Sequence, residues 1–320
     1  MTNALREHHK PFRYFSLPHQ PPVPMRRHAE RVRFAMITSV RDLASEGVGN
    51  RRTTRPGEEV YVKGTLEYAL EQSVRGKLAH FLELVLVITD DTERDMKKLA
   101  SPLPLKPTRE LPWIHPLAMR TRHGELVSSI TRNIQSSYRL LPLSDKGGRA
   151  AEKRRFEDRI RSAMALHGAQ ILVSDHFLCR VEHLISPQFY DLQNKVLNIH
   201  PGISDRYHRF RTPGATPYAD AIERAQGLRG PAHHRTGASF HIMEQEIDAG
   251  PVMVDVERTP VDAHDEWMDL CARNYPLSKN PAFSEGLIHY AQHIYPRLET
   301  IDLNILQPFE TDQPLYDRVA

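Results

Sequence analysis

Short apolar segments that alternate with helical patterns constrain the fold of this chain more than any other feature. Residues 33–39 and 81–88 are two such segments, each of a length typical of a buried strand. Between them, residues 65–78 have apolar side chains at the spacing of an amphipathic helix. A strand, a helix and a strand in this order predict a βαβ unit with parallel strands and a right-handed crossover.

The alternation continues in the second half of the chain. Helices are expected over residues 150–167 and 217–225. The apolar face of the first of these is predicted to hold Phe156, Ile160, Ala163 and Leu166. Further strands are expected over residues 170–174, 195–199, 237–243 and 251–257. Together these elements predict an α/β domain with a mainly parallel sheet and helices on both faces.

The composition narrows the class of protein. Hydrophobic residues make up 40% and charged residues 26% of the 320 residues, which excludes collagen, a coiled coil and a wholly disordered chain. No apolar run reaches the roughly 18 residues of a transmembrane helix. The net charge of +3 is too small to indicate a nucleic-acid partner. Cys179 and Cys271 form neither a disulfide framework nor a CxxC metal motif, so we expect a cytoplasmic protein without a membrane partner.

Three further regions flank or interrupt the predicted domain, which spans residues 32–260. Residues 1–31 are polar and rich in proline and lack the apolar stretch of a signal peptide. This N-terminal arm is expected to be poorly ordered or to pack on a partner subunit, which would make the protein a homodimer. Residues 102–148 are expected to form an irregular insertion because prolines crowd its beginning. Residues 261–320 are expected to be a short C-terminal extension.

The segment between residues 196 and 254 has the side chains that best fit a reaction. Asn198 and His200 are two residues apart at the end of a predicted strand, so both can project to the same side. Asp248 lies in a turn that Gly250 and Pro251 define. An amide, an imidazole and a carboxylate that meet in one cleft suit acyl-group chemistry. Taken alone, the same residues are also compatible with ordinary turn capping.

Three motifs in this segment resemble one enzyme family. They are residues 197–201 (LNIHP), 237–241 (GASFH) and 247–252 (IDAGPV). Their order and spacing resemble the 10-formyltetrahydrofolate-dependent formyltransferases, clearly over residues 150–257 and more loosely back to residue 33. The resemblance implies a formyltransferase-type Rossmann-like fold, in which residues 32–260 would be the catalytic domain.

The resemblance also implies a mechanism, in which a formyl group passes directly from 10-formyltetrahydrofolate to an amine without a metal. Asn198 and protonated His200 would stabilise the oxyanion, and Asp248 would hold the imidazolium and help to move the proton. His241 falls on the histidine of the family's G-x-T-x-H strand, where Ser239 replaces the commoner threonine.

The folate site implied by the resemblance lies along two stretches of the chain. One is the run 174–181, which departs from the family pattern because Asp175 and His176 stand where small residues are usual. The residues expected to contact folate are Phe177, Leu178, Arg180, Glu244, Gln245 and Ile247. For Phe177 and Leu178, simple core packing is an equal alternative.

The acceptor is expected to be a small-molecule amine or hydroxylamine. The segment 39–43 lacks the glycine-rich phosphate turn of glycinamide ribonucleotide formyltransferases, and the 60 residues after position 260 are too few for the C-terminal barrel of methionyl-tRNA formyltransferases. The chain looks most similar to the N5-hydroxyornithine formyltransferases of siderophore biosynthesis. The expected partners of the amino-acid head group are Arg41, Arg206, Arg209 and Arg211 for its carboxylate, and Asp42 and Asp205 for its ammonium group.

Other readings of the same motifs stay open. An amino-sugar N-formyltransferase would use the same catalytic residues, as would a formyltetrahydrofolate hydrolase, although residues 1–31 cannot supply the N-terminal domain of such hydrolases. A non-catalytic binding module would be expected to lack one of Asn198, His200 and Asp248. The basic loop 205–213 is either a specificity loop for the acceptor or a surface insertion.

Overall fold

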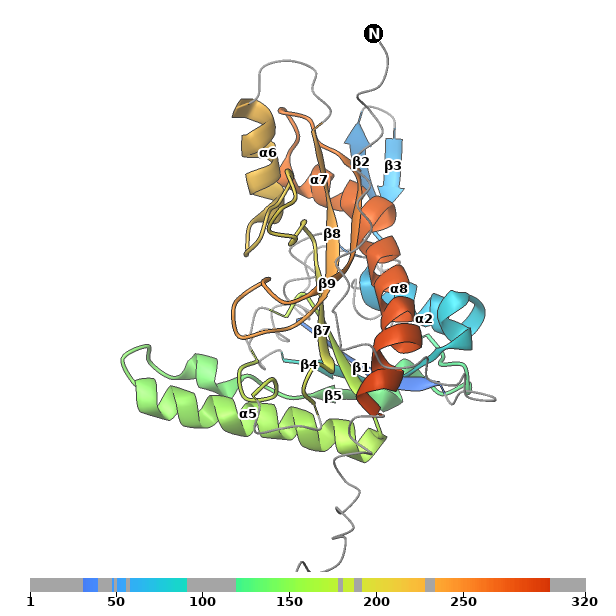
Figure 1. Cartoon of the computed structure of the whole chain (residues 1–320), viewed down its shortest axis with the longest axis vertical. Coiled ribbons are helices and arrows are strands. Elements are labelled where there is room, and N and C mark those ends of the chain that lie inside the picture. The colour runs from blue at the N-terminus through green and yellow to red at the C-terminus, as the bar shows by residue number, and fades with distance from the viewer. Residues whose placement is uncertain are drawn as a thin grey trace, which may run out of the picture.

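The computed structural model describes residues 31–39, 48, 51–55, 58–90, 119–177, 181–186, 192–227 and 234–299 (Figure 1). Seven of its strands form one sheet, in the order β5–β4–β1–β6–β7–β8–β9. These strands are β5 (Thr131–Asn133), β4 (Leu82–Thr89), β1 (Val32–Thr38), β6 (Ile171–Asp175), β7 (Val196–His200), β8 (Arg235–Ile242) and β9 (Val252–Pro260). The predicted arm lies almost entirely outside the described residues, as do the prolines at the beginning of the predicted insertion.

The remaining elements are helices and a separate two-stranded ribbon. The α-helices are α2 (Thr65–Arg75), α5 (Lys146–His167), α6 (Pro217–Gly227), α7 (Trp267–Asn274) and α8 (Asn280–His289). Two π-helical segments, η4 (Tyr275–Lys279) and η5 (Tyr290–Ile294), follow α7 and α8. The short 3-10 helices are η1 (Lys77–His80), η2 (Val127–Ile130) and η3 (Ser137–Leu140). The ribbon pairs β2 (Arg51–Arg55) with β3 (Glu58–Tyr61). None of the described helices is long and apolar enough to cross a membrane.

The sheet has a parallel part and an antiparallel edge. Strand β1 pairs in parallel with β4 on one side and with β6 on the other, and β6 pairs in parallel with β7. Because α2 lies between β1 and β4 in the chain, the predicted parallel βαβ unit is confirmed. Strands β8 and β9 complete the sheet as antiparallel neighbours of β7. The mainly parallel α/β fold is therefore confirmed, with an antiparallel edge that supplies half of the candidate site.

Two details of the sequence prediction are wrong. Residues 131–133, placed in the irregular insertion, form strand β5 and pair in parallel with β4. This strand has only three residues, all at least partly exposed, so no apolar run marks it in the sequence. Leu166, placed on the apolar face of α5, is 80% exposed, because it lies roughly 120° around the helix from the buried Ile160. Met164 completes the buried face instead.

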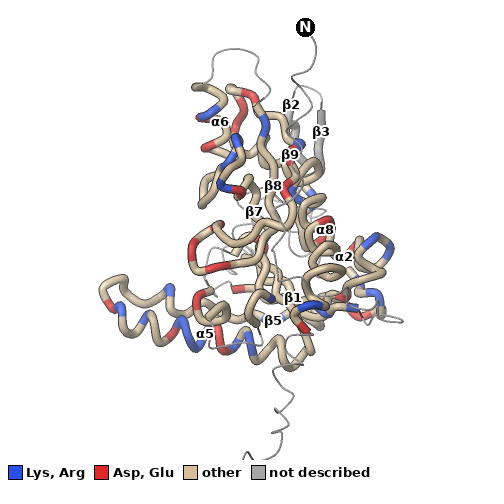
Figure 2. The backbone as a smooth tube through the Cα atoms, in the orientation of Figure 1, with Lys and Arg blue, Asp and Glu red and all other residues tan. Residues whose placement is uncertain are grey.

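Alternating side chains of the central strands supply two hydrophobic layers. Ala35 and Ile37 face α5, whereas Phe34 and Met36 face α2 and α8. Figure 2 shows that acidic and basic residues are interspersed along α5, as is usual for a helix with one face in water.

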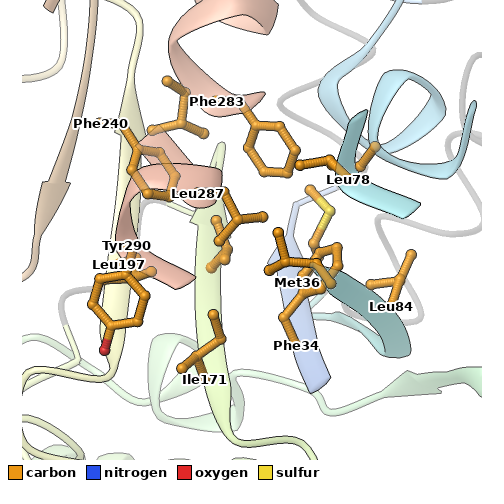
Figure 3. Close-up of a cluster of buried hydrophobic side chains, with 14 of the residues drawn as sticks. Phe34, Met36, Leu78, Leu84, Ile171, Leu197, Phe240, Phe283, Leu287 and Tyr290 are labelled. Atoms are coloured by element: carbon orange, nitrogen blue, oxygen red, sulfur yellow. The ribbon is translucent and has the colours of Figure 1, made fainter. Parts of the chain in front are cut away.

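The hydrophobic layer that faces α2 and α8 includes residues beyond position 260. Phe283, Leu287 and Tyr290 of the C-terminal helices lie in the same cluster as Phe34 and Leu197 (Figure 3). The core therefore continues into the predicted C-terminal extension, and position 260 does not coincide with a break in packing.

Candidate functional site

The end of β7 lies beside β8 with the polar side chains of both strands in register. Asn198 is paired with His241, and His200 is paired with Ser239. Because side chains alternate along a strand, Asn198 and His200 share one face of the sheet. Asn198 and His200 therefore project to the same side, as the sequence predicts, and His241 of β8 lies beside them.

A tight loop between β8 and β9 carries Asp248 to the same place. A side chain at Gly250 would come within 1.8 Å of the Ile242 carbonyl oxygen, so only glycine allows the loop to close so tightly. Asp248 itself has a φ of 52°, in the left-handed region that aspartate tolerates better than most residues. Its Oδ2 lies 3.5 Å from His200 Nδ1, and its Oδ1 lies 3.5 Å from His241 Nε2.

The surroundings of Asp248 favour its ionised form. Burial by itself raises the pKa of this carboxyl, but the contact with His241, the attraction of the His200 ring when it is protonated and the backbone N–H of Gly214 lower the pKa to about 2. The N–H of Gly214 donates to Oδ2 over 2.8 Å. Gly214 has a φ of 91°, a conformation that again requires glycine. Asp248 is therefore a carboxylate at neutral pH.

His200 is held as a neutral ring with one unprotonated nitrogen. Burial lowers its pKa, against the opposing effects of the Asp248 charge and the Thr212 carbonyl. Its Nε2–H donates to the Thr212 carbonyl oxygen over 2.8 Å, and this contact assigns the tautomer. In the neutral ring the lone pair then lies on Nδ1, which faces Asp248. The geometry prepares Nδ1 to accept a proton and Asp248 to stabilise the resulting cation.

His241 lies between Asn198 and the same carboxylate. Its Nδ1–H donates to the Ile242 carbonyl oxygen over 3.0 Å, and its Nε2 accepts a hydrogen bond from Asn198 Nδ2 over 3.1 Å. One N–H of the Asn198 amide is thus engaged, and the other is left to donate to a ligand. Asn198 is only partly buried, so a ligand can reach it from solvent. We call these four side chains, Asn198, His200, His241 and Asp248, the β7 cluster.

The structure places the predicted folate-contacting residues in two different environments. Phe177 is buried in the core and stacks on Phe156, with ring centroids 6.1 Å apart. The loop residues Glu244, Gln245 and Ile247 are exposed beside Asp248. Leu178 and Arg180 lie outside the described residues.

The predicted acceptor-contacting residues are also divided. Arg41 and Asp42 lie outside the described residues. Asp205 is partly buried and accepts a hydrogen bond from the Tyr207 backbone N–H over 2.9 Å, which closes a local turn. Arg206, next to it, is exposed.

Sequence reasoning missed the groups that hold the β7 cluster through their backbone. Thr212 acts through its carbonyl and Gly214 through its N–H. Because neither contact uses a side chain, the residue types at these positions do not show which group each one binds. Sequence reasoning also missed a second buried polar cluster, formed by Asp175, His176, Tyr275 and Lys279 at the end of β6. We call it the β6 cluster.

Among the described residues, neither a large cavity nor a metal centre coincides with the β7 cluster. A cavity of about 570 Å³ lies between α5, Lys195 and Tyr295, at the opposite end of β6 and β7 from His200, so it is not the candidate site. Within the described part of the chain, no group of three or more His, Cys, Asp or Glu side chains is arranged to hold a metal ion.

Comparisons with known proteins agree with this geometry. Residues 125–280 match the family described as formyl transferase. Among solved structures, the chain is similar to PvdF of pyoverdin biosynthesis, an N10-formyltetrahydrofolate-dependent formyltransferase. The TM-score is 0.70 at 27% sequence identity, and the match covers 82% of this chain and 100% of that chain.

Two further solved structures match the chain less closely. Phosphoribosylglycinamide formyltransferase from Anaplasma phagocytophilum has a TM-score of 0.48 at 16% identity, covering 82% of this chain and 88% of that one. A formyltetrahydrofolate deformylase from Pseudomonas syringae has a TM-score of 0.47 at 14% identity, covering 83% of this chain and 63% of that one. No curated protein sequence matches the chain.

Proposed function

Because the chain belongs to the formyl transferase family, we propose that it transfers a formyl group from 10-formyltetrahydrofolate to the hydroxylamine nitrogen of N5-hydroxyornithine. The observation that carries the transfer chemistry is the meeting of Asn198, His200 and Asp248 at the end of β7. The likeness to PvdF, an N10-formyltetrahydrofolate-dependent formyltransferase of pyoverdin biosynthesis, supports this donor and a siderophore substrate.

The donor fits the open side of the β7 cluster. Glu244, Gln245 and Ile247 form an exposed loop directly before Asp248, so their backbone groups are accessible to a ligand. When bound, 10-formyltetrahydrofolate supplies the formyl group. The formyl oxygen would lie within reach of the amide N–H of Asn198 that does not bond to His241.

In the proposed reaction the residues of the β7 cluster act in sequence. Asn198 donates a hydrogen bond to the formyl oxygen as negative charge develops there. His200 Nδ1 takes the proton that the acceptor nitrogen loses on attack, and Asp248 stabilises the imidazolium so formed. His200 then returns this proton to the leaving nitrogen of the donor. A hydroxylamine suits this site because it is uncharged at neutral pH and needs no prior deprotonation.

Two residues are proposed to hold the amino-acid head of the acceptor. Asp205 would bind the ammonium group and Arg206 the carboxylate, because both lie at the start of the loop that also positions Thr212 and Gly214. In this proposal the loop therefore contacts both the acceptor and the β7 cluster.

The test is a mass-spectrometric assay with 10-formyltetrahydrofolate and a panel of amines. The panel contains N5-hydroxyornithine, ornithine, glycinamide ribonucleotide and two nucleotide-linked amino sugars, and protein with His200→Gln is the control. We expect a formyl mass gain on N5-hydroxyornithine alone. Gain on an amino sugar would retain the transfer chemistry and replace the acceptor. Release of formate with no modified amine would show a hydrolase instead.

A further inference from the structure

The β6 cluster places a buried positive charge at the end of β6. Lys279 Nζ lies 2.7 Å from Asp175 Oδ1, and the two side chains are 0% and 1% exposed. Lys279 Nζ also donates to Tyr275 OH over 3.3 Å and contacts His176 Nε2. Tyr275 OH lies 2.6 Å from the same nitrogen of His176. The ammonium group is thus surrounded by acceptors, as a buried cation requires.

The backbone around this cluster is unusual in two places. The helix changes from α to π geometry at Tyr275–Lys279, which brings both side chains toward the sheet. His176 has a φ of 50°, although it is not glycine. π-helical turns and left-handed non-glycine residues cost energy, persist only where surrounding contacts hold them, and are frequent at functional sites.

The β6 cluster is directly connected to the end of β7. Ser174 is paired with Asn198 across the parallel strands. Asp175, the last residue of β6, lies one position beyond this pair. Asn274, immediately before Tyr275, donates from Nδ2 to the carbonyl oxygen of Pro201 over 3.2 Å. The segment 274–279 therefore contacts the chain just after β6 and just after β7.

We propose that Lys279 is a positioning residue for the formyl-transfer site. With Asn274 it fixes the ends of β6 and β7, and its buried positive charge favours the uncharged imidazole of His200. This inference rests on the proposed function only for the role of His200 as the proton-accepting group.

The groups that face His200 give the sign of this effect. They are Asp248 from the loop after β8, His241 from β8 and the carbonyl of Thr212, and the charge of Lys279 in η4, which is paired with Asp175, also acts on the ring. Burial lowers the pKa of His200 most, and the positive charge of Lys279 acts in the same direction, whereas Asp248 raises it. A cation at position 279 therefore keeps His200 in the form that can take a proton from the acceptor.

The experiment measures the titration of His200 directly. Protein labelled with ¹³C-histidine is titrated by NMR, and the His200 signal is identified by its loss in His200→Gln. The variants are Lys279→Met and the double variant Asp175→Asn/Lys279→Met, which leaves no buried charge unpaired. We expect the titration midpoint of His200 to rise by several tenths of a pH unit in Lys279→Met and by less in the double variant, which also removes the opposing negative charge of Asp175. The acidic limb of the kcat/KM pH profile should move in the same direction.

A matched control removes an ion pair from the surface of the same region. Arg258 and Glu285 lie 3.5 Å apart on β9 and α8, with side chains 57% and 49% exposed. The double variant Arg258→Met/Glu285→Gln should leave the His200 midpoint unchanged, because solvent screens exposed charges.

The outcomes separate this inference from the proposed function. Folded variants with an unchanged His200 midpoint would overturn the inference, even if the enzyme is active. Failure of both variants to fold would also overturn it, because Lys279 would then serve folding alone. A raised midpoint in a protein that formylates none of the tested amines would retain the electrostatic role of Lys279 and reject the proposed function.

Discussion

The β7 and β6 clusters lie at the ends of adjacent strands, yet they differ in what can reach them. In the β7 cluster Asn198 is partly exposed, and the loop before Asp248 is open to solvent. In the β6 cluster the charged atoms of Asp175 and Lys279 are buried in the interior. By the alternation of side chains along β6 and β7, the two clusters also project from opposite faces of the sheet.

The difference in exposure fits different roles for the two clusters. Groups that exchange protons with a ligand must be reachable by it, and in the β7 cluster the partly exposed Asn198 and the exposed loop before Asp248 lie next to a buried imidazole and a buried carboxylate. A charge that only sets the local potential is most effective where water cannot screen it, as in the β6 cluster. The following variants test this division, beginning with the largest expected effect.

Replacing His200 by Gln should nearly abolish formyl transfer. The amide can still donate to the Thr212 carbonyl oxygen, but it cannot take a proton from the acceptor. We expect kcat to fall by about 10³-fold or more, within the usual range for the loss of a general base. Single-turnover kinetics with N5-hydroxyornithine measure the effect, and thermal unfolding confirms that the variant is folded. Turnover near the wild-type rate would remove His200 from the mechanism.

Asp248→Asn should produce a smaller loss, confined mainly to kcat. The amide oxygen can still accept from the Gly214 N–H, so the loop should keep its place. The imidazolium of His200 loses its counter-charge, and we expect kcat to fall by about 10²-fold with little change in KM. A rise in KM at unchanged kcat would show that Asp248 binds substrate instead of stabilising the cation.

A surface pair gives the matched control for Asp248→Asn. His183 Nε2 lies 3.3 Å from Asp158 Oδ1, and the Asp158 side chain is 56% exposed. Asp158→Asn therefore makes the same chemical change beside another histidine, away from β7. This variant should leave kcat and KM unchanged.

The sequence predicts the parts of this molecule that bury apolar side chains at a regular period. The runs at 33–39 and 81–88 correspond to β1 and β4, since buried parallel strands are apolar on both faces. Strand β5 has no such pattern, because it is short and lies at an edge of the sheet. The role of the C-terminal helices in the core was not predicted, because nothing in residues 261–320 shows locally that they pack on β8.

The candidate site also has one part that the sequence predicts and a neighbouring part that it does not. Asn198, His200 and Asp248 stand in short motifs whose order can be read along the chain, and the structure brings them together. The β6 cluster has no such motif, because the contact between Asp175 and Lys279 depends on the packing of α7 and η4 against the sheet. Contacts that depend on tertiary packing between distant segments leave no periodic signal in one sequence.

The smallest expected effect concerns stability in acid and distinguishes Asp248 from an ordinary carboxyl. Its pKa is about 2 in the folded protein against 3.8 for an unperturbed aspartate. A lowered pKa means that the unfolded chain binds the proton more tightly. The stabilisation is therefore complete above about pH 4 and is lost as the pH falls from there through about 2.

This difference corresponds to about 2 kcal/mol of unfolding free energy. Urea unfolding of the wild type and Asp248→Asn between pH 2.5 and 7 measures it, with Asp158→Asn as the reference for an exposed carboxyl. The stability gap between the wild type and Asp248→Asn should stay constant down to about pH 4 and then narrow. His200 contributes separately, because its lowered pKa places the onset of its effect near 6.5, the value of an unperturbed histidine. A gap that stays constant through the acid range would show that Asp248 is not held as a carboxylate by its neighbours, and the β7 cluster would then lack the charge that its proposed chemistry requires.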